Sequence, residues 1–96
     1  MVSSKIVEKI MKTMLCYNQV QDFNKWKQIF NSHSSAHEEA GLRLINLWRE
    51  IGKPNNVYFV LEFEDLDKAQ AFINSPHSEQ AGQEAGVIDG WVRFME

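Results

Sequence analysis

The chain has 96 residues, of which 44% are hydrophobic and 24% charged, and its formal net charge is −3. This length and composition fit one small globular domain, residues 1–96, rather than a disordered chain. Acidic and basic residues are interspersed without a basic block, which argues against nucleic-acid binding. The single cysteine, Cys16, excludes an internal disulfide, and no apolar run approaches the ~18 residues of a membrane span. We therefore expect a cytoplasmic protein that binds neither membrane nor nucleic acid.

The first third of the chain predicts a strand and a long helix. We expect residues 1–9 to form a loose polar arm and the apolar run at 10–20 to form a strand. Asp22 is of the type that caps a helix N-terminus, and Gly41 of the type that ends a helix. One helix is therefore predicted between Asp22 and Gly41.

The middle of the chain predicts a β-hairpin. In its first strand, residues 42–51, Leu44 and Trp48 have the same parity and are expected to share a face. Residues 53–56, Lys-Pro-Asn-Asn, supply turn residues. The second strand, residues 57–64, places apolar side chains on both faces: Val57, Phe59, Leu61 and Phe63 on one, Tyr58 and Val60 on the other.

The last third predicts two short helices and a strand. Asp65 caps the first of these helices, whose expected buried residues are Leu66, Ala69, Phe72 and Ile73. Ser75-Pro76 begins the next helix, which Gly86 ends, and Gly90 opens a last strand from Trp91 to Met95.

The resulting order is β-α-β-β-α-β, an α+β fold of the ferredoxin-like plan. Right-handed crossovers place the helices on one face of a four-stranded antiparallel sheet. Because the strands are apolar on both sides, the bare face requires a cover, and a homodimer formed by two sheets meeting face to face supplies one. The alternative is that scattered apolar residues stay exposed on that face.

Several short motifs resemble the dimeric α+β barrel superfamily, and within it the small antibiotic-biosynthesis-monooxygenase-like proteins. They are Val20-x-Asp22-Phe23-x-x-Trp26-Lys27-x-x-Phe30, His33, Ala40-Gly41, Pro54-Asn55-x-Val57, Glu62-Phe63-x-Asp65, Ala69-x-x-Phe72, Ser75-Pro76 and Ala85-Gly86-Val87. The resemblance implies a dimer paired through its sheets, with a pocket in each subunit between sheet and helices. It also implies activities that range from cofactor-free oxygenation of aromatic polyketides to haem degradation. Haem-degrading members use an Asn on the first strand, a Trp on the third and a His on the late helix. Asn18 and His77 match two of these, but the third strand has no Trp, which argues against haem cleavage.

The candidate site lies on the long helix. At ~100° per residue, one stripe within roughly 80° carries aromatic residues and then two imidazoles: Phe23, Trp26, Phe30, His33 and His37. A neutral imidazole in a pocket can accept a proton from a phenol or an enol. The alternatives are that both histidines lie at the helix end without a role, or that they bind a metal with a third ligand from His77, Glu84 or Asp89. His77 itself is expected to face solvent.

The sequence therefore predicts a homodimer with a small, mostly apolar pocket in each subunit. The predicted catalytic residues are His33, His37 and Asn18, with His33 holding a proton and the other two stabilising an oxyanion. Trp26, Phe30, Trp48 and Tyr17 are predicted to line the pocket. The expected function is a monooxygenase- or cyclase-like reaction, without metal or cofactor, on a small aromatic or enolisable substrate. The alternatives are a non-catalytic binding module for a small hydrophobic ligand and a purely structural dimer.

Overall fold

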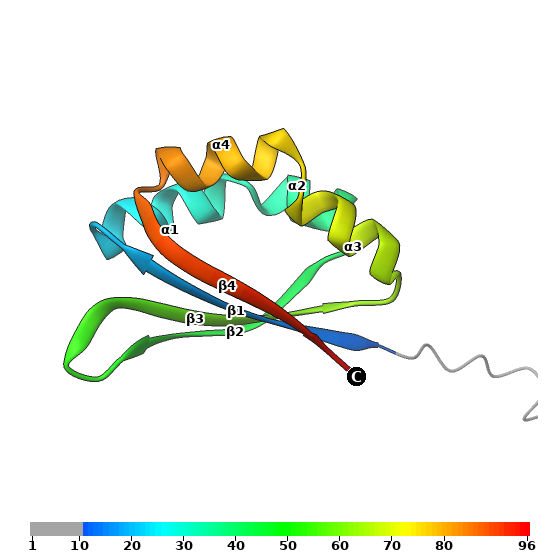
Figure 1. Ribbon diagram of the computed structural model, residues 1–96, viewed down its shortest axis with the longest axis horizontal. Coiled ribbons are helices and arrows are strands. Elements are labelled where there is room, and N and C mark those ends of the chain that lie inside the picture. Colours follow the sequence, from blue (N-terminus) through cyan, green and yellow to red (C-terminus); the bar gives the residue numbers. More distant parts are fainter. Residues whose placement is uncertain (1–10) are drawn as a thin grey trace, which may run out of the picture.

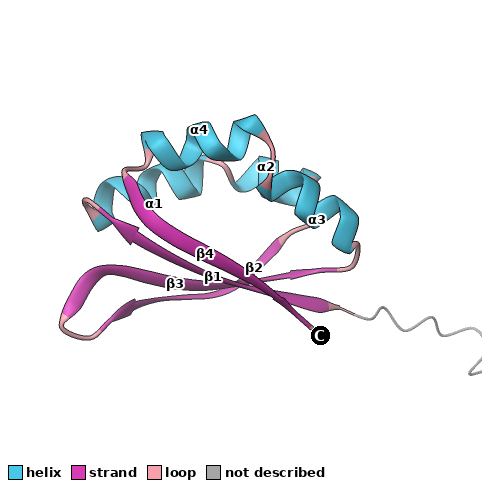
Figure 2. Ribbon diagram, viewed as in Figure 1, coloured by secondary structure: helices cyan, strands magenta, loops and turns pink. Residues whose placement is uncertain are grey.

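The computed structural model describes residues 11–96, and the arm expected at residues 1–9 lies outside them. Along the chain the elements are β1 (Lys12–Val20), α1 (Phe23–Ser32), α2 (Ser34–Glu39), β2 (Arg43–Glu50), β3 (Lys53–Phe63), α3 (Leu66–Ile73), α4 (Pro76–Glu84) and β4 (Val87–Met95). The strands form one antiparallel sheet in the order β2-β3-β1-β4. The four helices lie together over one face of this curved sheet, as predicted (Figures 1 and 2). Within residues 11–96, no helix has the length and apolarity needed to cross a membrane.

The predicted single helix between Asp22 and Gly41 is wrong, because the chain leaves helical geometry at His33 and forms α1 and α2 instead. His33 has φ −98° and ψ 12°, and its N–H donates to the Phe30 carbonyl only three residues back. Ser32, at the end of α1, donates its hydroxyl to the Ile29 carbonyl at 2.6 Å. Such hydrogen bonds from serine to the backbone compete with the helical ladder.

The predicted helix ends are confirmed at the residues that carry the capping chemistry. Asp22, Asp65 and Ser75 each accept a backbone N–H at the start of α1, α3 and α4. At the end of α2, Gly41 has φ 78°, its N–H donates to Glu38, and the Leu42 N–H donates to His37. These two bonds form a Schellman motif, which turns the chain into β2 and holds the backbone of His37 in place.

Two strand boundaries differ from the prediction. The hairpin turn is Ile51-Gly52, not residues 53–56, because Glu50 already pairs with Lys53 and Gly52 supplies the positive φ of 83°. The last strand begins at Val87 rather than after Gly90. Gly90 lies inside β4 and pairs with Asn18, where a side chain would have no room.

The face of the sheet under the helices, the inner face, carries the core. Its buried residues on the sheet are Met14, Cys16, Val20, Val57, Phe59, Leu61 and Phe63. Ala69 of α3 is fully buried, and Phe72 and Ile73 pack against this core, whereas Leu66 is 37% exposed and does not belong to it.

Trp26 of α1 is the largest side chain buried between a helix and the sheet, with 2% of its surface exposed. Its ring centroid lies 4.8 Å from that of Phe30 and 5.6 Å from that of Phe59 on β3. Such aromatic contacts add to the free energy gained by burying the rings. The aromatic part of the predicted stripe is therefore core, and it sets the position of α1 above the sheet.

The opposite face of the sheet, the outer face, carries one row of aromatic rings across all four strands. Tyr17 of β1 pairs with Tyr58 of β3 and Trp91 of β4, with ring centroids 5.0 and 5.5 Å away. Trp48 of β2 pairs with Tyr58 and is 48% exposed. Leu44 does not share this face, because the register shifts between Leu44 and Asn46 and pairs Leu44 with the inner-face residue Leu61.

Candidate functional site

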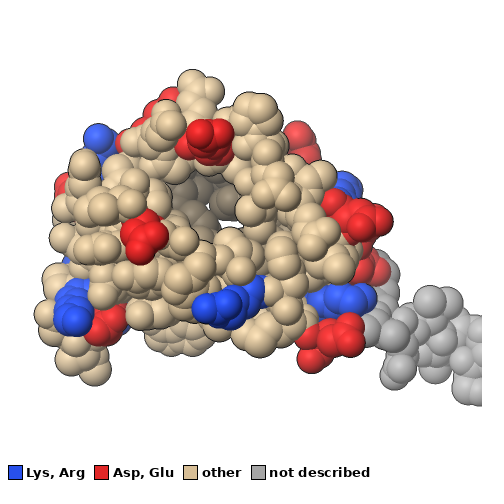
Figure 3. Space-filling view, in the orientation of Figure 1, with Lys and Arg blue, Asp and Glu red and all other residues tan. Residues whose placement is uncertain are grey.

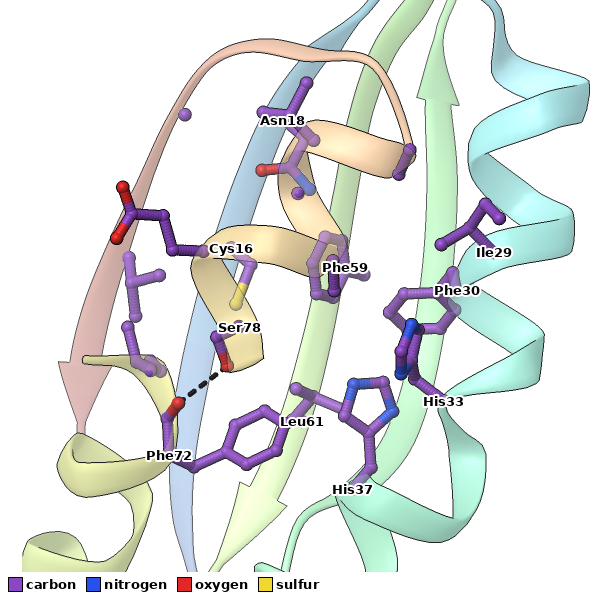
Figure 4. A pocket seen from close by; sticks show the side chains of 18 of the residues that line it. Cys16, Asn18, Ile29, Phe30, His33, His37, Phe59, Leu61, Phe72 and Ser78 are labelled. Atoms are coloured by element: carbon purple, nitrogen blue, oxygen red, sulfur yellow. Dashed lines mark hydrogen bonds between the residues drawn. The ribbon is translucent and has the colours of Figure 1, made fainter. Parts of the chain in front are cut away.

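A cavity of about 540 Å³ lies between the helix layer and the inner face of the sheet. It opens to the surface at the hollow in the middle of the molecule in Figure 3. Its walls are mostly apolar, with contributions from β1, β3, β4 and all four helices (Figure 4). A cavity of this size and lining suits a small organic molecule.

Five of the predicted site residues line this cavity together: Asn18, Trp26, Phe30, His33 and His37. The prediction that Tyr17 and Trp48 line the same pocket is wrong. Tyr17 points away from the cavity because its neighbours in β1, Cys16 and Asn18, point into it, and successive side chains of a strand alternate. Trp48 pairs with Tyr58 in the outer-face row.

Asn18 lies at one end of the cavity, and His37 lies at the other end (Figure 4). With its amide oxygen directed at Trp26, Asn18 accepts a hydrogen bond from the Trp26 Nε1–H at 3.1 Å and donates one to the Tyr17 carbonyl at 2.9 Å. An amide NH₂ has two donors, so one remains for a ligand. Since Asn18 and His37 are at opposite ends, they would contact different parts of a bound molecule.

His37 projects from α2 between two phenyl rings. Its ring centroid is 5.0 Å from that of Phe30 and 5.6 Å from that of Phe72 on α3. Burial, and secondly the neighbouring His33, lower the pKa of His37 below the usual 6.5 of histidine. At neutral pH this imidazole is therefore uncharged and has a nitrogen lone pair with which to accept a proton.

His33 stands at the junction of α1 and α2 and is half-buried. Its ring lies against that of His77 on α4, edge to face, with 5.0 Å between centroids. His77 is exposed, as predicted, yet it also lines the cavity. Sequence reasoning placed His77 near His33 only as one of three possible metal ligands, because the ring contact itself depends on how α4 folds back over α1.

The structure argues against two other kinds of site, a metal site and a reactive cysteine. Among residues 11–96, no three histidine, cysteine, aspartate or glutamate side chains are grouped closely enough to hold a metal ion, so the metal alternative lacks its third ligand. Cys16 lines the cavity but is 4% exposed, and burial raises the pKa of its thiol to about 12. Because the thiolate is the reactive form, Cys16 is an inert wall residue at neutral pH.

Comparisons with known proteins support the fold and leave the activity open. No family model and no curated protein matches the sequence. Among solved structures, the chain is similar to a protein from Bordetella bronchiseptica that is provisionally named an antibiotic biosynthesis monooxygenase, with a TM-score of 0.73 and 16% identity over 90% of this chain and 95% of that one. A Caulobacter crescentus protein of the same provisional name has a TM-score of 0.69 and 12% identity, with 88% and 87% covered. An uncharacterised NIPSNAP-like domain protein from Burkholderia xenovorans has a TM-score of 0.63 and 15% identity, with 93% and 86% covered.

These likenesses confirm the resemblance that the sequence motifs indicated, at the level of the fold. The chain shares the ferredoxin-like α+β fold with these solved structures. At such low identity a shared fold does not carry over an activity or a substrate, because one fold supports many functions.

The close approach of Gly90 to Asn18 yields a test of the site geometry. A Cβ on Gly90 would lie 2.7 Å from the Asn18 side-chain amide and 2.7 Å from the Tyr17 carbonyl oxygen. We expect Gly90→Ala to displace Asn18 and to lower the free energy of unfolding by about 1–3 kcal/mol in urea titrations, as overpacking does. The control is Gly82→Ala on α4, where the atom nearest to the added Cβ is 4.0 Å away. This substitution should leave the free energy of unfolding unchanged or raise it. Equal stability of Gly90→Ala and wild type would contradict the placement of Asn18 against β4.

Proposed function

We propose that this protein binds a small aromatic or enolisable molecule in the inner-face cavity and removes a proton from it. The enolate or phenolate so formed is the intermediate from which oxygenation or cyclisation proceeds. The observation that carries this proposal is the neutral imidazole of His37, held between Phe30 and Phe72 on the wall of an otherwise apolar cavity. The similarity to solved structures named as monooxygenases is consistent with it.

The cavity supports this substrate class through its walls. Phe30 and Phe72 line the cavity and are only partly buried, so they offer aromatic surface, which stabilises flat apolar ligands. The volume of about 540 Å³ accommodates a molecule of two or three fused rings. A low-dielectric surrounding also strengthens any hydrogen bond between the ligand and the few polar groups that line it.

In the proposed reaction His37 is the general base. Its lowered pKa keeps the imidazole unprotonated at neutral pH, which is the form that accepts a proton from an acidic C–H or O–H. The donor left over on the Asn18 amide lies at the far end of the cavity and orients a ligand carbonyl there. This assignment gives the base to His37, the imidazole packed between Phe30 and Phe72, whereas the sequence alone favoured His33.

Anthrone, a three-ring ketone with acidic protons at C10, is a suitable probe. Without oxygen, the protein should speed exchange of these protons with D₂O, followed by NMR. With oxygen, anthrone and O₂ should yield anthraquinone and water. His37→Gln should slow the exchange about 100-fold, the usual contribution of a general base, while the Kd of anthrone changes little.

Glu39→Gln is the matched control, because Glu39 is an exposed residue of α2 that does not line the cavity. It should leave the exchange rate unchanged. Tight binding of anthrone without any exchange above the buffer rate would show that the protein is a non-catalytic binding module and not an enzyme. Exchange that His37→Gln does not slow would refute His37 as the base.

We also propose that the outer face pairs with a second copy of this chain. In the aromatic row, Trp48 is 48% and Trp91 36% exposed and the two tyrosines are partly exposed, and Met95 on the same face is 43% exposed. The polar groups beside the row already satisfy one another: Tyr17 donates to Asn56, and both Asn56 and Tyr58 donate to Glu50. These hydroxyl, amide and carboxylate groups keep their hydrogen bonds when the face is buried.

Light scattering should give twice the monomer mass of 11.2 kDa at low micromolar concentration. Trp91→Glu, which places a charge in the row, should yield monomers. Ile51→Glu, at the fully exposed hairpin turn, should remain dimeric. A wild-type monomer at tenfold higher concentration, or a dimer that Trp91→Glu leaves intact, would contradict pairing through the outer face.

A further inference from the structure

We propose that His33 and His77 form a subsite for a carboxylate group on the ligand, at the mouth of the inner-face cavity. This inference rests on the proposed function, because it identifies one end of the molecule that the cavity binds. The ligand is then an aromatic or alicyclic carboxylic acid rather than a neutral hydrocarbon-like molecule.

The first observation is that the polar groups of the cavity are unevenly distributed. The cavity is lined by three histidines, which come from the α1–α2 junction, from α2 and from α4. His33 and His77 are in ring contact at 5.0 Å, and Figure 4 places His33 beside His37. Asn18 lies at the opposite end (Figure 4). A ligand bound along the cavity therefore meets imidazoles at one end and an amide at the other.

The second observation is that the side chains of His33 and His77 have hydrogen-bonding groups left over for a ligand. Within residues 11–96, neither His33 nor His77 makes a side-chain hydrogen bond or an ion pair with another residue. An imidazole ring always has at least one N–H donor, and two when it is protonated. Two such donors on adjacent rings can each bond one oxygen of a carboxylate, and charge-assisted bonds of this kind are strong.

The third observation concerns charge. Burial, and secondly the neighbouring His33, lower the pKa of His37. A bound carboxylate favours a protonated imidazole, because its negative charge stabilises the positive charge of the ring. Binding of the acid should therefore take up a proton, and its affinity should fall as the pH rises through the histidine range.

The other titratable groups that line the cavity are few. Glu79 of α4 is the one carboxylate among the lining residues described, and it forms no ion pair with the histidines. It lies two positions after His77 on α4, a spacing that directs the two side chains apart on a helix. Cys16 lines the wall as a neutral thiol, so Glu79 is the charge that works against an anionic ligand.

Two probes of the same shape separate a carboxylate preference from simple apolar binding: 2-naphthoate and its neutral amide, 2-naphthamide. Their Kd values are measured by calorimetry at pH 6 and pH 8. We expect the Kd of 2-naphthoate to rise at least about fivefold over this interval, since loss of one required proton costs up to tenfold per pH unit. The Kd of 2-naphthamide should change less than about twofold.

Substitutions of His33, His77 and Glu79 test which residues cause the pH dependence of 2-naphthoate binding. His77→Gln, at an exposed position, and His33→Gln/His77→Gln should remove the pH dependence and weaken 2-naphthoate, with 2-naphthamide affinity retained as evidence of an intact cavity. Glu79→Gln should keep the pH dependence and tighten 2-naphthoate.

The failures of the two proposals are distinguishable. If 2-naphthamide and 2-naphthoate bind equally at both pH values, the carboxylate subsite is wrong and the apolar cavity stands. A pH dependence that persists in His33→Gln/His77→Gln also overturns the subsite. Binding of neither probe overturns the subsite and the ligand-binding cavity together.

Discussion

The rest of the structure depends on the placement of Trp26 between α1 and the sheet. Its ring packs on Phe30 and Phe59, and its indole N–H donates to Asn18 on β1. One side chain thus fixes the position of the first helix over the sheet and orients the amide at one end of the cavity. The cavity extends from this aromatic cluster to residues of α2 and α4.

The two faces of the sheet carry different kinds of apolar surface. The inner face is aliphatic and aromatic and deeply buried, and at one end of its cavity lie His33 and His77, whose side chains make no hydrogen bond or ion pair within residues 11–96. The outer face presents Tyr17, Tyr58 and Trp91 in contact across neighbouring strands, with a hydrogen-bonded polar edge at Glu50 and Asn56. In the proposed account the inner face binds the ligand, and the outer face binds a second copy.

The sequence predicted best those features that depend on residues close together in the chain, such as helix caps and the alternation of side chains along a strand. Asp22, Asp65 and Ser75 cap helices as predicted, and the alternation in Val57–Phe63 correctly identifies the core face of β3. Such features depend on neighbours within a few residues. The break at His33 was missed because hydrophobic periodicity continues across it, with Phe30 and His37 still facing one cavity.

The candidate site was predicted only in part, for a physical reason. Residues on the α1–α2 stripe were found because helical spacing places them together, and Asn18 was found through the resemblance to a first-strand Asn of the related family. Tyr17 and Trp48 were misplaced because aromatic content does not tell which face of a strand a ring occupies, and a register shift separates Leu44 from the parity of Trp48. The contact of His33 with His77 joins segments 44 positions apart, and no local pattern records it.

The central claim, that the two faces of the sheet have separate partners, is tested most directly by the three indole N–H signals in a ¹⁵N–¹H NMR spectrum, assigned with Trp→Phe variants. Trp26 reports on the cavity, and Trp48 and Trp91 report on the outer face. The account predicts that adding 2-naphthamide shifts the Trp26 signal alone, whereas diluting the protein through dimer dissociation shifts the Trp48 and Trp91 signals alone. Ligand-induced shifts confined to Trp48 and Trp91, with Trp26 unmoved, would contradict it.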